Sequence, residues 1–285
     1  MRKLLLYIHA ISPITLLSSL LSACIGLTLS VKTGHVNVLN SILVFLGLLL
    51  LHTAVNLYND YCDYKSGVDL MYRRMHVLHR TSLIIDLGVN PRHVRDIALL
   101  LVAIAVSIGT YIMLSIGQVQ IIVLLIALGL LIGLGYSGGL RLRYHGLGEV
   151  FAGIAIGPLV SLGSYVAISG SLDYAATAAI LGIPNGLFTT VILMLIGAKR
   201  AHVDKLVGKR TLATKIGPEK CTRVAVTLLY IAYALIVAYV MARELSPVSL
   251  LGLLAMFSHL GNLNVKRLFL ARTIVTLFIC LGLLL

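Results

Sequence analysis

Amide and carboxylate side chains gather directly after a long apolar run that ends at Val55. Asn59 and Asp63 are four residues apart and Asp60 and Asp63 are three apart, so they are neighbours if the helix continues. Adjacent carboxylates repel each other, and the C-terminal end of a helix already carries partial negative charge. A hard divalent cation such as Mg²⁺, bound through carboxylates and substrate phosphates, would relieve this repulsion. We predict that Asn59, Asp60 and Asp63 bind a metal ion; the alternative is a solvated helix end that only terminates a membrane span.

A second polar segment, residues 197–217, is basic. It contains Arg200, Lys209 and Arg210, and its single carboxylate is Asp204. A basic segment that faces an acidic one across the mouth of a helix bundle forms a site for a diphosphate, because the metal bridges phosphate oxygens while Lys and Arg neutralise the remaining charge. The alternative is a segment that binds only lipid headgroups.

A third polar patch, residues 135–149, is rich in glycine and contains Arg141 and Arg143. Both arginines are candidates for phosphate contacts. The alternative reading treats them as basic anchors on a short loop beside the membrane.

The composition identifies the elements that must position these side chains. The chain is 59% hydrophobic and 12% charged, with a mean hydropathy of +1.01, whereas a soluble domain is about 25% charged. We therefore expect an all-α, polytopic membrane bundle. In a soluble protein the net charge of +13 would suggest a nucleic-acid partner. Here basic loops and anionic lipid headgroups explain it, so we expect the lipid bilayer, and not nucleic acid, as a partner.

Apolar windows of about 20 residues predict transmembrane helices. The sequence contains nine, which we expect to form a single transmembrane domain over residues 1–285. The predicted spans are 12–31, 38–59, 94–113, 117–137, 147–169, 174–196, 222–242, 247–263 and 267–285. Pro158 and Pro184 lie inside spans, where a kink is tolerated.

The distribution of basic residues predicts the orientation. With the N-terminus in the cytoplasm, the 23 Lys and Arg residues all fall in cytoplasmic segments except Lys32 and Arg243. Arg2, Lys3, Arg80 and Arg272 are counted among the cytoplasmic ones. We therefore expect an integral protein of the plasma membrane. The two longest polar loops, 60–93 and 197–221, then share the cytoplasmic face.

The three polar segments together resemble the UbiA superfamily of intramembrane prenyltransferases, and within it the 1,4-dihydroxy-2-naphthoate polyprenyltransferase branch of menaquinone synthesis. The first motif of that family begins Asn-Asp-x-x-Asp and matches residues 59–63, with Gly67 and Asp69 following. Residues 144–149 (YHGLGE) and 208–213 (GKRTLA) also resemble that branch, and in the same order. The resemblance covers nearly the whole chain, and nine spans match the architecture of the family.

The second motif of the family departs from its usual form in this chain. It usually carries two Asp four residues apart; Asp204 matches the later one, but Arg200 stands where the earlier is expected. Residues 79–88 also lack the usual Arg-Pro pair and Gly-rich segment. Two accounts follow. In one, a single metal remains on the first motif and Arg200 pairs with the diphosphate, which Arg can do bidentately. In the other, the second metal site and the activity are lost.

The resemblance implies Mg²⁺-dependent transfer of a polyprenyl group from a polyprenyl diphosphate to an aromatic acceptor, with loss of a ring proton and, in the naphthoate branch, of the acceptor carboxylate. It implies that Asp60, Asp63 and Asp204 are catalytic, and that the metal ligands are Asn59, Asp60, Asp63 and Asp204. The residues expected to contact substrate are Asn56, Tyr136, Arg141, Arg143, Arg200, Lys209 and Arg210.

Three other functions stay open: isoprenoid binding without catalysis, prenyl transfer to a glycerol-phosphate lipid, and transport. A transporter is disfavoured because the polar residues cluster on one face and no inverted repeat is evident.

Two further residues are expected to be structural. Asp69 would close a loop, and His52, in the middle of a span, would be bonded to a backbone carbonyl.

Overall fold

The computed structural model describes residues 12–77, 81–259 and 263–285. The predicted cytoplasmic residues Arg2, Lys3 and Arg80, and the start of the altered 79–88 segment, lie outside these ranges. Within them the chain is helical and contains no strand. The elements are α2 (Pro13–Lys32), α3 (Val38–Lys65), α4 (Val68–Arg74), α5 (Pro91–Ile116), α6 (Val119–Gly135), η1 (Leu142–Tyr144), α7 (Gly148–Ile154), η2 (Ala155–Leu159), α8 (Val160–Ser169), α9 (Ala175–Leu206), α10 (Leu212–Ile216), α11 (Pro218–Met241), η3 (Pro247–Ser258) and α12 (Val265–Leu284).

The nine apolar segments expected from the sequence are all helical in the described ranges. Seven are long and apolar enough to cross a membrane, counting the continuous α7–η2–α8 stretch as one. The other two are α6, with 17 residues, and η3, with 12. Because η3 is a 3₁₀-helix, which rises about 2.0 Å per residue, its 12 residues extend over roughly 24 Å. The length of η3 therefore approaches the thickness of a bilayer core, although the helix has few residues.

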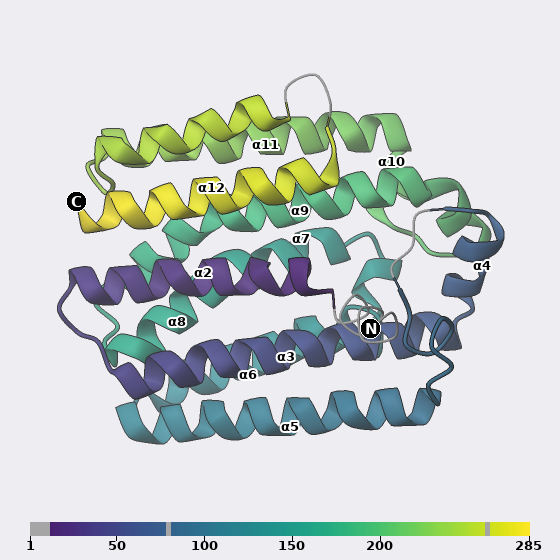
Figure 1. Cartoon of the computed structure of the whole chain (residues 1–285), viewed down its shortest axis with the longest axis horizontal. Helices are drawn as coiled ribbons and strands as arrows, with labels where there is room; N and C mark the ends of the chain where they lie inside the picture. The colour runs from purple at the N-terminus through teal and green to yellow at the C-terminus, as the bar shows by residue number, and fades with distance from the viewer. Residues whose placement is uncertain (1–11, 78–80, 260–262) are drawn as a thin grey trace.

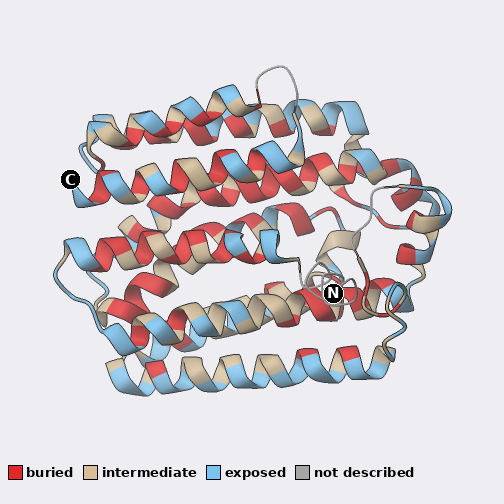
Figure 2. Cartoon of the chain, viewed as in Figure 1, coloured by how far each residue is buried: buried red, intermediate tan, exposed pale blue. Residues whose placement is uncertain are grey.

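The long helices lie side by side, with α9 in the middle of the bundle (Figure 1). Helices α11 and α12 lie on one side of it, and α3 and α5 pack against each other on the opposite side (Figure 1). Helix α9 is the most buried of the long helices, and buried residues follow it along most of its length (Figure 2). Large apolar side chains such as Leu114, Phe257 and Leu277 point outward, as expected for helices that face lipid.

One of the long spans contains a π-helical turn. Helix α7 continues through η2, which contains Pro158, into α8. Proline removes a backbone donor and pushes the helix out of regular register, so the kink expected at Pro158 takes this form. Glycines let this stretch approach α9 closely: a Cβ at Gly157 would lie 2.5 Å from the Cα of Gly186.

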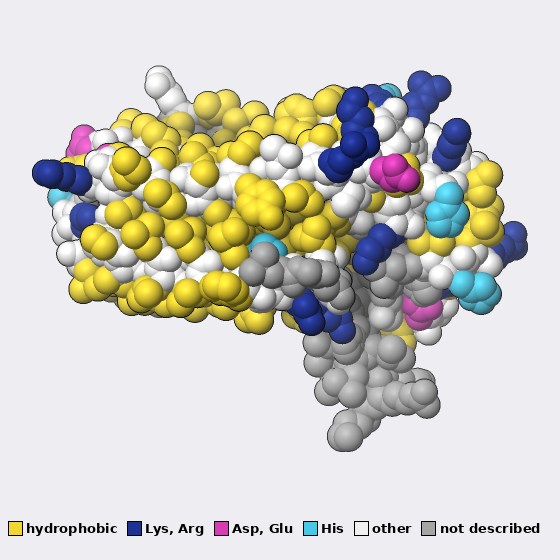
Figure 3. Space-filling view, turned by 90° about the horizontal axis from the view of Figure 1, so that it is seen from above, with side chains coloured by type: hydrophobic (Ala, Val, Ile, Leu, Met, Phe, Trp, Pro, Cys, Tyr) yellow, Lys and Arg dark blue, Asp and Glu magenta, His cyan; other side chains and the backbone are white. Residues whose placement is uncertain are grey.

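Two helices continue furthest beyond the C-terminal ends predicted for their spans. Helix α3 runs to Lys65 instead of residue 59, and α9 runs to Leu206 instead of residue 196. Their last turns, together with α4 and α10, lie at one end of the bundle, which we call the polar end (Figure 1). The face in Figure 3 is mainly hydrophobic along the bundle, while most of its charged and His side chains gather at this end.

Candidate active site

The first motif occupies the last turns of α3. Asn59, Asp60 and Asp63 are therefore helical neighbours, as their spacing predicted, and the helix ends at the Ser66 cap. Asp60 and Asp63 are both buried, with 3% and 6% of their surface exposed. Carboxylates that are so far removed from water need cations or hydrogen-bond donors close by.

Asp63 is paired with Arg143 of η1. The Arg143 Nη1 group donates to both Asp63 oxygens, at 2.9 and 2.7 Å, and to the Ser137 hydroxyl at 3.2 Å. The guanidinium also lies 5.4 Å from the centre of the Tyr136 ring. Burial works to lower the pKa of Arg143, but Asp63 beside it outweighs burial and holds that pKa well above the ordinary value. Arg143 is therefore a permanent cation next to the first motif.

Asp60 is covered by the segment that follows α4. Its Oδ2 atom accepts a hydrogen bond of 2.9 Å from the backbone N–H of Leu83. A bidentate ion pair fixes this segment to α4: Arg73 reaches Asp86 from Nε at 3.1 Å and from Nη2 at 2.5 Å. Residues 81–89 therefore form a cover over Asp60, although they lack the family's usual sequence there.

Asp204 lies in a buried network at the end of α9. The Tyr72 hydroxyl of α4 donates to its Oδ1 atom, and the Lys209 ammonium donates to that hydroxyl at 3.0 Å. The Lys209 Nζ atom is 3.8 Å from Asp204 Oδ1. Burial lowers the pKa of Lys209 to about 7, and neighbouring Arg143 adds to this, while Asp63 and Asp204 act in the opposite direction. Burial raises the pKa of Tyr72, which therefore remains a neutral phenol.

Arg200, which replaces the expected Asp, points at the same tyrosine. Its guanidinium lies 4.8 Å from the centre of the Tyr72 ring, and Lys209 lies 5.5 Å from that centre. The structure thus brings Arg143, Arg200 and Lys209 together around the acidic residues. Two predicted diphosphate contacts are not part of this buried cluster: Arg141 and Arg210 are both exposed at the surface.

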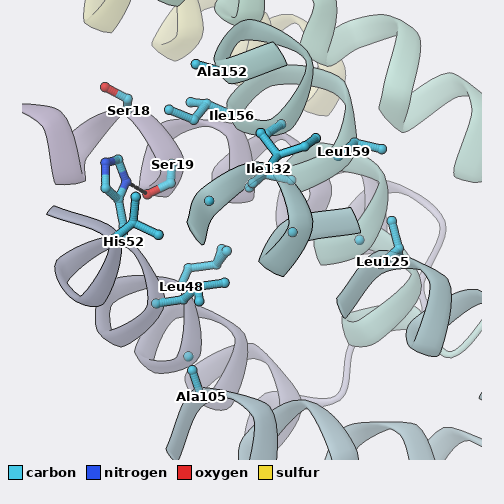
Figure 4. Close-up of a pocket in the computed structure, with 18 of the residues that line it drawn as sticks. Ser18, Ser19, Leu48, His52, Ala105, Leu125, Ile132, Ala152, Ile156 and Leu159 are labelled. Atoms are coloured by element: carbon cyan, nitrogen blue, oxygen red, sulfur yellow. Dashed lines mark hydrogen bonds between the residues drawn. The ribbon is translucent and has the colours of Figure 1, made fainter. Parts of the chain in front are cut away.

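A cavity of about 420 Å³ lies inside the bundle and reaches Asn59 of the first motif; this volume is typical of small-molecule sites. Side chains from α2, α3, α5, α6, the α7–η2–α8 span, α9 and α12 line it, and they are mostly apolar (Figure 4). At the polar end it is lined by Asn56, Asn59 and Tyr136. Asn56 donates to the Thr15 hydroxyl at 3.1 Å. The amide and the phenol predicted to contact substrate therefore face this cavity.

The residues of the first motif fit a hard cation only in part. In the described chain, no group of three His, Cys, Asp or Glu side chains is close enough to form a metal site by itself. The first motif nevertheless supplies oxygen donors of the kind that Mg²⁺ prefers. The Oδ1 atom of Asn59 is buried and has no hydrogen-bond partner within the described residues. This donor set fits one cation completed by phosphate oxygens, whereas Arg200 beside the paired Asp204 does not fit a second.

Sequence reasoning missed the role of Tyr72 and misplaced Arg272. Tyr72 lies in the segment 60–93, which the sequence predicts as a polar loop, and only the tertiary fold brings it to Asp204. Arg272 was counted with the cytoplasmic charges, which is wrong: it lies inside α12 with 1% of its surface exposed. His52 is bonded to the Ser19 hydroxyl, at 2.9 Å, and not to a backbone carbonyl as expected (Figure 4).

The sequence profile described as the UbiA prenyltransferase family matches residues 19–281. The chain belongs to the UbiA prenyltransferase family. It is 26% identical to a Bacillus subtilis 1,4-dihydroxy-2-naphthoate octaprenyltransferase over 236 residues, which cover 82% of this chain and 73% of that protein. It is 28% identical to the UbiA prenyltransferase domain-containing protein 1 of Danio rerio, covering 80% of this chain and 66% of that protein.

Solved structures of UbiA homologues share the same fold. A UbiA homologue from Aeropyrum pernix K1 superposes with a TM-score of 0.68 at 21% identity, covering 93% of this chain and 96% of that one. A UbiA homologue from Archaeoglobus fulgidus bound to GPP and Mg²⁺ also gives a TM-score of 0.68, at 15% identity, covering 97% of this chain and 98% of that one. At these identities the likeness shows the fold alone.

Proposed function

We propose that this UbiA family member transfers a polyprenyl group from a polyprenyl diphosphate to an aromatic acceptor of the 1,4-dihydroxy-2-naphthoate type, in quinone biosynthesis and with Mg²⁺. The observation that carries this proposal is the position of the Asn59–Asp63 turn beside an apolar cavity. A diphosphate at the polar end can extend its hydrocarbon tail into that cavity. The similarity to the Bacillus subtilis naphthoate enzyme supports the choice of acceptor class.

The acidic and basic residues have distinct roles in this proposal. Asn59, Asp60 and Asp63 would hold the cation, which neutralises charge that develops on the departing diphosphate. Arg143, Arg200 and Lys209 bind the remaining phosphate oxygens. Arg143 already lies against Asp63, so on substrate binding its guanidinium exchanges the carboxylate for phosphate. Asp204 and Tyr72 hold Lys209 in place for the same anion.

The cavity supplies the conditions for forming the new bond. The allylic C–O bond breaks and its electron pair leaves with the diphosphate. An electron-rich ring carbon then attacks the allylic cation, and the ring loses a proton or, for a naphthoate, its carboxylate as CO₂. Water would capture the cation, and the apolar walls exclude water. Tyr136 lines the same cavity, and in this proposal its side chain would lie beside the reacting carbon.

We also propose that the polar end faces the cytoplasm, since it carries most of the basic residues. Soluble aromatic acids and diphosphates would then reach the site directly from the cytoplasm.

A non-catalytic isoprenoid-binding protein is the second candidate, and one observation favours it. Asp204 is already bonded to Tyr72 and faced by Lys209, and Arg200 stands beside it in place of a carboxylate. A second metal position is therefore missing. If one cation is insufficient for ionisation, the bundle binds prenyl chains without turning them over.

The deciding experiment is prenyl transfer by the purified protein with Mg²⁺, for the wild type, Asp63→Asn and Arg200→Asp. The proposal predicts transfer by the wild type and loss of transfer in both variants. A silent wild type with a gain of activity in Arg200→Asp would identify a degenerate enzyme. Parallel assays with 1,4-dihydroxy-2-naphthoate and a glycerol-phosphate lipid as acceptors test the acceptor class, and transfer only to the latter would overturn it.

A further inference from the structure

Arg272 is a charged residue in the wall of the cavity, away from the acidic motifs. It is the eighth residue of α12, so it lies about 10 Å along the helix from Val265. Its side chain is 1% exposed, yet it lines the same cavity as Asn56 and His52. An ionisable residue at this depth of a membrane bundle is costly and calls for a partner.

The contacts of Arg272 do not supply a partner with the opposite charge. Its Nη1 group donates to the Thr189 hydroxyl at 3.4 Å, which is long for a hydrogen bond. Its Nε and Nη2 groups are buried and have no hydrogen-bond partner among the described residues. The guanidinium lies 4.9 Å from the centre of the Phe269 ring, and none of the described residues that line the cavity is acidic. Donors are thus left over for a ligand.

The other polar groups of the cavity wall are neutral. His52 is paired with the Ser19 hydroxyl at 2.9 Å, as Figure 4 shows, and Asn56 with Thr15 at 3.1 Å. Most of the remaining surface is apolar, from side chains such as Leu48 and Ile132 (Figure 4), and the other polar side chains of the described wall, such as Ser18 and Ser164, carry no charge. A ligand suited to these walls is flat or hydrocarbon over most of its surface and carries a single negative charge.

We propose that Arg272 binds the carboxylate of an aromatic acid acceptor inside the cavity. This inference rests on the function proposed above, which includes such an acceptor. The planar guanidinium fork matches the two oxygens of a carboxylate. The two donors for such a group are Nε and Nη2, which have no hydrogen-bond partner among the described residues, while Nη1 can keep its long bond to Thr189. One cation matches a monoanion, whereas a phosphate ester carries about −1.5 to −2 and needs more donors than this wall offers. Arg272 is therefore a specificity-determining residue, separate from the diphosphate cluster.

The test measures binding alone, so it does not depend on turnover. The purified protein in nanodiscs, without donor or Mg²⁺, is titrated with 1-hydroxy-2-naphthoate and with 1-naphthol, which differ by the carboxylate. The wild type is expected to bind the acid more tightly than the naphthol. Arg272→Gln is expected to weaken binding of the acid about 10- to 100-fold, and to leave binding of 1-naphthol unchanged. Arg272→Lys keeps the charge without the planar guanidinium, so its affinity for the acid should lie between those of the wild type and of Arg272→Gln.

Arg267→Gln is the matched control, because it removes an exposed arginine of the same helix. It is expected to bind both ligands like the wild type. Equal affinity of the wild type for the acid and for the naphthol would overturn the assignment, even if Arg272→Gln does not fold. An affinity for the acid that is the same in all variants would also overturn it. A glycerol-phosphate lipid that competes more strongly than the acid would also overturn it. Absence of prenyl transfer, by contrast, contradicts only the proposed reaction.

Discussion

The Arg143 Nη1 group donates to both carboxylate oxygens of Asp63, at 2.9 and 2.7 Å, across 80 positions of the sequence. This pair joins the end of α3 to η1, and both side chains are mostly buried. In the site without substrate, an arginine of the chain itself thus offsets charge of the first motif. A metal ion that binds Asp63 must therefore compete with Arg143, and a diphosphate that binds Arg143 must compete with Asp63.

Breaking the pair on one side should destabilise the protein. In Asp63→Asn or Arg143→Gln, the remaining buried charge loses this ion pair, which costs about 3–5 kcal/mol. Thermal unfolding in detergent should show both losses, and the double variant should be more stable than the sum of the two by roughly 1–3 kcal/mol. Strict additivity would mean that the two side chains do not interact.

Binding of the donor should depend on pH through Lys209. Its pKa is held at about 7 by burial and by Arg143, so the ammonium is charged below that pH and neutral above it. An anion favours the charged form and raises this pKa on binding, so a proton is taken up above pH ~7. The dissociation constant of a prenyl diphosphate should therefore increase from about pH 7 to pH 9, measured by calorimetry in buffers of different ionisation enthalpy. Lys209→Gln should flatten this dependence; an unchanged slope would assign it to another group.

The Tyr72 hydroxyl should contribute more to stability than other tyrosine hydroxyls of the polar end. It donates to Asp204 and accepts from Lys209, so Tyr72→Phe leaves two buried charged groups without that bond. The expected loss is about 1–3 kcal/mol in thermal unfolding. Tyr144→Phe is the control, since among the described residues that hydroxyl bonds Ser66 alone, at 3.2 Å and with solvent access. Similar losses in both variants would contradict a special role for the Tyr72 network.

Close packing of η2 on α9 can be tested with a pair of glycines. A Cβ at Gly157 would meet backbone atoms of Gly186 at 2.5 and 2.6 Å, which cannot move without displacing the helix. Gly157→Ala should therefore cost about 1–3 kcal/mol or more. Gly129→Ala is the control, because outside its own helix backbone and chain neighbours no atom lies within 4 Å of the added methyl, and Ala is the better helix former. It should be neutral or slightly stabilising, and a loss as large as that of Gly157→Ala would disprove the packing argument.

The sequence predicts the number and order of the apolar helices, but not where two of them end. Long apolar runs fix the spans, because only internally bonded helices are stable in lipid. Hydropathy falls near residue 59 in α3 and near residue 196 in α9, so the sequence predicts that the spans end at these residues. Both helices continue for several residues, since polar side chains at a membrane surface are compatible with helix. The continuation places the first motif and Asp204 on regular helix turns.

The residue types of the site could be predicted, but their pairing could not. Helical spacing indicates which carboxylates are neighbours, whereas the pairs of Asp63 with Arg143 and of Asp204 with Tyr72 join distant segments. Arg272 shows the limit of a charge count. The count places it with the cytoplasmic charges, whereas packing of α12 against the bundle buries it in the cavity wall.

The most direct test of the account is binding of a non-hydrolysable farnesyl diphosphate analogue to the protein in nanodiscs, with Mg²⁺ or with EDTA. We expect the wild type to bind it in a Mg²⁺-dependent manner, and both EDTA and Asp60→Asn to weaken binding roughly tenfold or more. Equal affinity with Mg²⁺, with EDTA and in Asp60→Asn would show that the first motif does not hold a cation against the diphosphate, and would contradict the proposed function.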